Sequence, residues 1–203
     1  MSERIKKLDV LRAIAIFLVV FGHSIILYSS QWNLYESPYT VPVLDGIKKW
    51  INLIQMPLFF FLAGFLFRKD CLCLSFKTLL YKKTLRLLLP YACCSLFWLL
   101  PIRLILKYPY YQNKEIASIL FKSLLLGSDN GHLWYLYSLF LCFVFSFLLL
   151  KVFNIIPKKS LRLILLISIA VIMFIVSARF DFLGFCKNFI WFCLGLMVSE
   201  IEI

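Results

Sequence analysis

Residues 8–24 have the sequence LDVLRAIAIFLVVFGHS, an apolar stretch typical of a membrane-spanning helix that nevertheless contains Asp9, Arg12 and His23. Charged groups in hydrocarbon cost a few kcal/mol or more each, so such residues in a span are rare and tend to be functional. Arg12 and His23 are eleven positions apart. At about 100° per residue this spacing places them on one side of a helix, about 16 Å apart along its axis. Asp9 lies one turn before Arg12, within reach of an ion pair. The stretch therefore predicts an apolar helix with one polar stripe.

The whole chain is too apolar for a soluble globule. Of its 203 residues 63% are hydrophobic and only 16% are charged, and the mean hydropathy is +0.91. We therefore predict an all-α protein: a polytopic bundle of transmembrane helices that crosses the cell membrane several times. A net charge of +12 would suggest nucleic-acid binding in a soluble domain, but the positions of the basic residues argue against that interpretation.

The basic residues gather in alternate connections between the expected spans. They lie before the first span (Arg4, Lys6, Lys7), after the second (Arg68, Lys69, Lys77, Lys82, Lys83, Arg86) and after the fourth (Lys151, Lys158, Lys159, Arg162). Cytoplasmic loops carry such an excess of Lys and Arg, so the pattern predicts a cytoplasmic N-terminus and no nucleic-acid partner.

Hydropathy predicts about six spans in a single domain over residues 1–203. The expected spans are residues 8–28, 51–67, 87–106, 132–152, 161–178 and 182–199. Two other apolar segments are expected outside them: residues 44–50 as an amphipathic stretch at the outer interface, and residues 116–127 on the membrane or re-entering it. The segment 68–85 is expected to be a cytoplasmic loop.

Three features predict local structure within these spans. Pro57 predicts a kink in the second span, and Pro101 predicts a break or kink near the end of the third. Ala63 and Gly64 predict close approach of another helix, because small residues allow two helix backbones to come together.

Several phrases carry a resemblance to a known family. LDVLRAIAIFLVVFGH resembles the first helix of the acyltransferase 3 family of integral-membrane O-acyltransferases, which carries an Arg, ten residues and a His. PLFFFLAGF is similar to the family's PLFFFxSGF, with Ala63 where Ser is common, and KKTLRLLLPY resembles its cytoplasmic Arg-x-x-Arg motif, with Lys83 in place of the first Arg. GHLWYL looks like a phrase of the polysaccharide and fucose O-acetylase branches. Full members have more membrane helices, so the resemblance implies an N-terminal part of the domain, truncated at its C-terminus.

The resemblance implies transfer of an acetyl or other acyl group from acyl-CoA to a hydroxyl of a cell-surface carbohydrate or lipid-linked sugar. His23 is then expected to be the catalytic base. Arg12, steadied by Asp9, would orient the donor and, with Lys83 and Arg86, bind its phosphates. The acceptor side and pore mouth are assigned to four residues: His132, Trp134, Asn52 and Gln55. Acetyl-CoA would be a donor substrate, no tightly bound cofactor is expected, and cysteines without paired C-x-x-C units predict no metal site.

Other interpretations of the same residues remain open. Lys83 and Arg86 also suit simple anchoring against anionic lipid. Intramembrane Asp9, Arg12 and His23 would fit a proton-coupled transporter, although the other spans offer few further carboxylates for a relay. A third interpretation is a non-catalytic family fragment that associates with itself or with a partner subunit.

Overall fold

The computed structural model describes residues 6–30, 39–71, 74–106, 115, 119, 133–153, 155–177 and 184–201. The regular elements in this part of the chain are helices, which confirms the all-α prediction. The main α-helices are α1 (Lys6–Ser24), α2 (Pro42–Cys71), α3 (Phe76–Lys83), α4 (Leu89–Cys94), α5 (Leu100–Ile105), α7 (Trp134–Phe153), α8 (Lys159–Ser177) and α9 (Gly184–Ile201). A 3₁₀ turn, η1 (Ile25–Tyr28), continues α1.

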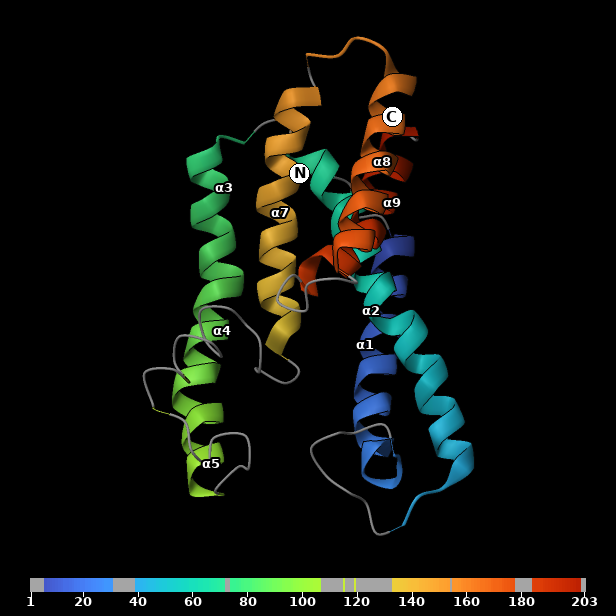
Figure 1. Ribbon diagram of the computed structural model, residues 1–203, viewed down its shortest axis with the longest axis vertical. Coiled ribbons are helices and arrows are strands. Elements are labelled where there is room, and N and C mark those ends of the chain that lie inside the picture. Colours follow the sequence, from blue (N-terminus) through green and yellow to red (C-terminus); the bar gives the residue numbers. More distant parts are fainter. Residues whose placement is uncertain are drawn as a thin grey trace.

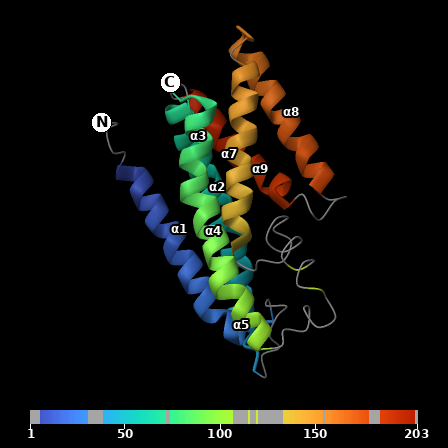
Figure 2. The ribbon, with the colours of Figure 1, turned by 90° about the vertical axis from the view of Figure 1, so that its left-hand side faces the viewer.

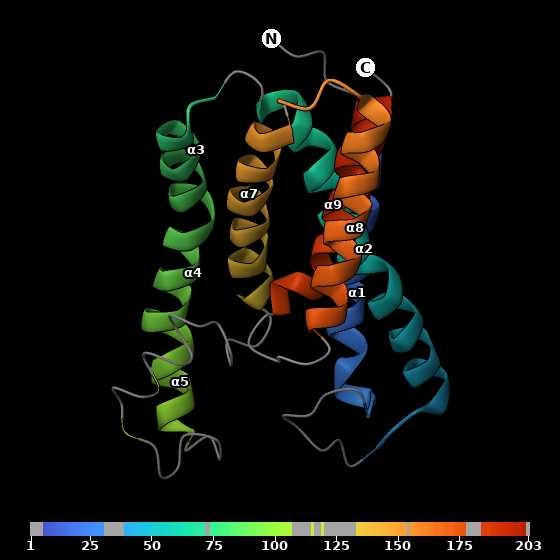
Figure 3. The same cartoon turned by 45° about the horizontal axis from the view of Figure 1, so that its top comes forward.

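The helices run up and down in one bundle (Figure 1). The start of α1, the end of α2, the start of α3, the α7–α8 connection and the end of α9 all lie toward the same end of the bundle, at the top in Figure 3. Apart from the end of α9, which carries Glu200, these are the segments in which the basic residues gather. The assignment of this end to the cytoplasm stays a prediction.

Four helical stretches of the described residues are long and apolar enough to cross a membrane: Pro42–Arg68, Phe76–Ile105, Trp134–Phe153 and Lys159–Ser177. The helix α1, by contrast, carries four charged residues in its first two turns: Lys6, Lys7, Asp9 and Arg12. The bundle is therefore that of a membrane protein, and the number of six spans stays a prediction.

The helix α2 is longer than predicted. Residues 44–50 and 51–67 were expected as two elements, but they form one continuous helix from Pro42 to Cys71. No glycine or proline stands at the expected boundary near Trp50, so nothing there interrupts the backbone hydrogen bonds. Pro57 lies inside the helix, where its missing N–H removes one of these bonds without ending the element.

The helices α3, α4 and α5 form one rod, and α2 extends to Cys71, so the expectation of a loop over residues 68–85 is wrong for residues 68–71 and 76–85. Two π-helical segments join the three parts, η2 (Thr84–Leu88) and η3 (Ser95–Leu99). Each is followed by a leucine and then by a proline, Pro90 or Pro101. In a π segment the backbone N–H bonds five residues back instead of four, which accommodates the proline ring and its missing donor. Pro101 does not break the helix, so of the predicted break or kink the break is wrong.

The core lies between α2, α7 and α9. It is rich in phenylalanine, and Phe60, Phe147, Phe189 and Phe192 are almost fully buried. Two glycines allow α2 and α9 to touch through their backbones. A Cβ atom on Gly64 would lie 2.1 Å from the carbonyl oxygen of Phe192, and one on Gly195 would lie 2.0 Å from that of Phe61. The close contact predicted from Ala63 and Gly64 is confirmed, with α9 as the partner helix.

The helix α1 lies at one edge of the bundle, with α8 at the opposite edge (Figure 2). It packs on α2 through residues spaced seven apart: Leu8, Ala15 and Gly22 are all buried. Seven residues are nearly two helical turns, so these three side chains form one narrow strip. Much of the remaining helix surface is exposed or half-buried, and this surface carries the polar residues.

Candidate functional site

The polar stripe of α1 exists as predicted. The helix is unbroken from Lys6 to Ser24, so Arg12 and His23 lie on one rigid element, on the same side and about 16 Å apart along its axis. Arg12 is four residues after Leu8 and His23 is one residue after Gly22, so the stripe runs beside the strip that packs on α2. Both side chains are exposed at the surface of the described chain.

Asp9 and Arg12 form the expected i,i+3 ion pair. The distance between Asp9 Oδ1 and Arg12 Nη1 is 3.6 Å, and the two side chains are 36% and 48% exposed. An ion pair this open adds little stability, so its main effect is to orient the guanidinium. The planar group can bind phosphate or carboxylate oxygens through two parallel N–H donors.

Asn52 and Gln55, predicted at the acceptor side, lie on α2 beside the His23 end of α1. Gln55 Nε2 donates a hydrogen bond to Asn52 Oδ1 at 3.0 Å, and Asn52 is exposed whereas Gln55 is buried. The other amide oxygen of the pair, Gln55 Oε1, lies 3.4 Å from the position of a Cβ atom on Gly22. The structure therefore brings these two predicted residues next to the backbone that carries His23.

Lys83 and Arg86 lie in different surroundings. The Lys83 ammonium is 3.4 Å from the ring centroid of Phe143 on α7 and 5.9 Å from that of Phe67, which is cation–π geometry. Arg86 stands on the π-helical segment η2 and is exposed. Of these two residues, which were predicted to bind phosphate together with Arg12, Arg86 is open to a ligand, whereas Lys83 also takes part in helix packing.

Of the two site residues predicted in the fourth span, Trp134 is among the described residues and His132 is not. Trp134 begins α7 and stacks near Phe60, with ring centroids 6.3 Å apart, and it also meets Tyr135 edge-on. It therefore belongs to the aromatic layer around the core. His132 and the segment 116–127 lie outside the described residues, apart from Ile119.

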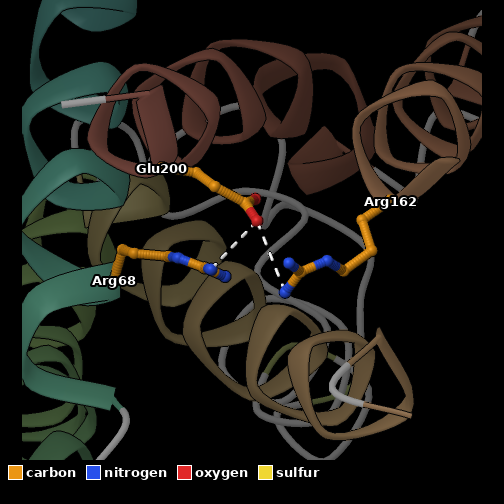
Figure 4. A network of polar contacts seen from close by, with 3 residues as sticks. All are labelled: Arg68, Arg162 and Glu200. Atoms are coloured by element: carbon orange, nitrogen blue, oxygen red, sulfur yellow. Dashed lines mark ion pairs between the residues drawn. The ribbon is translucent and has the colours of Figure 1, made fainter. Parts of the chain in front are cut away.

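Sequence reasoning missed one buried ion cluster. Glu200 Oε1 lies 3.1 Å from Arg68 Nη2 and 3.5 Å from Arg162 Nη1, and Figure 4 shows both arginines directed at this carboxylate. The cluster joins the ends of α2, α8 and α9. The sequence signal for this cluster was Glu200, an acidic residue at the end of an apolar helix. The distribution of basic residues placed Arg68 and Arg162 at the same membrane face.

Lys48 was the second residue missed. It lies within the stretch expected at the outer interface, yet its side chain is only 3% exposed and its ammonium contacts Gly22 of α1. A lysine next to Lys49 on an amphipathic segment resembles ordinary surface charge, so the sequence alone gave little signal for its burial.

The molecule is a helical membrane protein. It carries an Arg and a His along one helix, next to buried polar groups of a second helix. The chain belongs to the acyltransferase 3 family, and it matches that family's acyltransferase domain over residues 5–202. No curated protein and no solved structure matches it. The match extends past Leu136, where the last phrase that carries the resemblance ends. The protein is an enzyme that transfers acyl groups.

Proposed function

We propose that the protein transfers an acetyl or related acyl group from acyl-CoA to a hydroxyl of a cell-surface carbohydrate or lipid-linked sugar, in the plasma membrane. The observation that carries this proposal is the placement of Arg12 and His23 on one unbroken helix, with the His23 end next to Asn52 and Gln55. Membership of the acyltransferase family supports an enzyme over the proton-coupled transporter.

Arg12 is the proposed donor-binding residue. Its exposed guanidinium, oriented by Asp9, suits the phosphates of a coenzyme A donor, and the exposed Arg86 offers a second cation of the same type. Lys83 is proposed to bind the same phosphates. Its ammonium lies over the Phe143 ring and would have to leave this contact to bind a ligand. Acyl-CoA is a substrate in this proposal, and no resident cofactor is required.

His23 is the proposed general base. A neutral imidazole can take the proton of an acceptor hydroxyl near physiological pH and return it to the leaving thiolate. The distance of about 16 Å between Arg12 and His23 along the helix suits a donor whose nucleotide head and thioester are joined by a long flexible arm. Asn52 and Gln55 provide amide groups that can hydrogen-bond the hydroxyls of a sugar.

The test is transfer of labelled acetyl groups by purified protein in liposomes, with acetyl-CoA as donor and a panel of saccharides and lipid-linked sugars as acceptors. The proposal predicts alkali-labile label on a sugar. It also predicts that Arg12→Gln raises the KM for acetyl-CoA at least about tenfold, the loss expected for one charge-assisted contact. Lys77→Gln, which removes an exposed charge from α3, is the matched control and should leave this KM unchanged.

Two results would contradict the proposal. One is folded protein that labels no sugar from acetyl-CoA but transports a solute or labels an acceptor from a donor without coenzyme A. The other is an equal rise of the donor KM in the Arg12 and Lys77 variants, which would assign the effect to general surface charge.

A further inference from the structure

Lys48 is a buried cation at the contact between α1 and α2. It stands in the second turn of α2 and is 3% exposed. Its ammonium nitrogen lies 3.0 Å from the position that a Cβ atom on Gly22 would take. A side chain at this point of α1 would press on the ammonium, so the glycine allows the ammonium to lie close to the helix backbone.

The nearby carboxylate is committed elsewhere. Asp45, three residues before Lys48 on the same helix, accepts hydrogen bonds from the hydroxyls of Ser29 and Ser30. In the part of the chain that the structure describes, Lys48 forms no ion pair and no hydrogen bond. Arg68 and Arg162, by contrast, both pair with the carboxylate of Glu200. A buried charge without a partner costs folding free energy, so its presence calls for a function.

A buried acceptor without a partner lies beside it. Gln55 is 7% exposed, and its Oε1 atom is buried with no hydrogen-bond partner among the described residues. Oε1 and the Lys48 ammonium lie 3.4 Å and 3.0 Å from the same Cβ position on Gly22, without bonding to each other. A donor and an acceptor therefore stand side by side, and both have capacity for a ligand.

This pair is at the level of His23. Gly22 and His23 are consecutive, and consecutive Cα atoms are 3.8 Å apart, so the Lys48 ammonium lies within about 8 Å of the His23 Cα atom. Arg12, by contrast, is about 16 Å further along the helix, too far to contact an oxygen atom beside the imidazole. Lys48 therefore supplies a positive charge on α2 at the level of His23.

We propose that Lys48 is a further catalytic residue, which stabilises the oxyanion formed during acyl transfer. The inference rests on the proposed function. The hydroxyl oxygen of the acceptor bonds to the thioester carbonyl carbon, its proton passes to His23, and the carbonyl π electrons move onto the oxygen that faces the ammonium. When these electrons return, the carbon–sulfur bond breaks and the thiolate leaves with the proton held by His23. Lys48 keeps its own proton throughout, and Gln55 Oε1 stays available beside it as a hydrogen-bond acceptor. A preorganised cation in a site of low dielectric constant is strongly stabilising for such charge.

The decisive variant is Lys48→Met, which removes the charge and keeps most of the volume. We expect kcat to fall about 100-fold, as for the loss of one oxyanion donor, with little change in the KM for donor or acceptor. Lys48→Arg should recover a large part of the rate because it keeps a cation. Lys49→Met is the matched control: it removes the exposed neighbouring charge and should leave kcat unchanged.

Thermal unfolding separates this role from a structural one. Replacement of an unpaired buried charge by an apolar side chain is neutral or stabilising, so Lys48→Met should unfold at the same temperature as the wild type or higher. The expected variant is therefore equally stable and much slower.

Each alternative outcome overturns the inference. A normal kcat in Lys48→Met while His23→Ala is inactive would remove Lys48 from the mechanism and leave the proposed function intact. A raised acceptor KM with normal kcat would make Lys48 a ground-state contact for an anionic acceptor. Lower stability with a rate that falls only in proportion to the folded fraction would make it structural. No acyl transfer by the wild type would overturn the proposed function, and this inference with it.

Discussion

The helices α9 and α1 are both apolar, but they differ in how their polar residues are treated. One side of the helix α9 is enclosed in the core: Phe189 and Phe192 are 0% exposed, and its one described carboxylate, Glu200, is held between two arginines. The helix α1 lies at the edge of the bundle, and the side chain of Arg12 is 48% exposed. Charges in the packed region are paired and hold helices together, whereas those on and beside α1 keep capacity for a ligand. The difference separates the groups that stabilise the fold from those that can perform chemistry.

The largest effect is expected where α2 and α9 touch. In Gly195→Ala the new Cβ atom would lie 2.0 Å from the Phe61 carbonyl oxygen and 2.7 Å from the Phe65 nitrogen, so one helix must move. Such overpacking costs about 3 kcal/mol or more when backbone atoms cannot yield. We expect a large fall in the yield of folded protein and in its unfolding temperature, measured in detergent by light scattering and differential scanning fluorimetry.

Gly46→Ala on α2 is the control for this prediction. Nothing lies within 4 Å of a Cβ atom at Gly46, so the substitution should be neutral or stabilising by up to about 1 kcal/mol. Equal unfolding temperatures for the Gly195→Ala and Gly46→Ala variants would show that the backbones of α2 and α9 are not in contact. The distinction between a packed α9 and an exposed α1 would then fail.

A smaller loss of stability is expected at the ion cluster. Glu200→Gln leaves the largely buried guanidinium groups of Arg68 and Arg162 without their carboxylate. Removal of one partner from a buried cluster costs about 3 kcal/mol. Because Glu200 has no assigned part in the chemistry, acyl transfer per folded molecule should stay normal.

Lys159→Gln, an exposed charge near the start of α8, is the matched control and should leave the unfolding temperature unchanged. A Glu200→Gln protein with normal stability but reduced transfer would reverse the comparison, because the cluster would then act in the reaction.

The smallest effect on stability is expected for Asp9→Asn. The Asp9–Arg12 pair is exposed, so its loss should change the free energy of unfolding by less than about 1 kcal/mol. The KM for acetyl-CoA should rise a few-fold, because the Arg12 guanidinium loses the group that orients it. A steady-state titration of donor checks this, and a loss of stability as large as that of Glu200→Gln would show that the pair belongs to the fold.

The sequence predicted those features that depend on residues close together in the chain. Periodicity along residues 8–24 was enough to place Arg12 and His23 on one side of a helix, and the i,i+3 spacing was enough for the Asp9–Arg12 pair. Ala63 and Gly64 indicated a close helix contact but not its partner, because a small residue reveals room for a neighbour without naming it.

Other features could not be predicted because they depend on which helices become neighbours. Glu200 meets Arg68 and Arg162 only after α2, α8 and α9 assemble, and Lys48 is buried only because Gly22 of α1 lies opposite. Pro101 misled for a local reason: the π-helical segment η3 before it keeps the rod continuous, whereas a simple rule for proline predicts a break or kink.

The most direct test of the account is the initial rate of acetyl transfer by His23→Ala in liposomes, at the same amount of folded protein as the wild type. If His23 is the general base, the rate should be at least about 100-fold lower, the contribution typical of a general base, with an unchanged unfolding temperature because the imidazole is exposed. A rate within about twofold of the wild type would contradict the account, since no general base contributes so little.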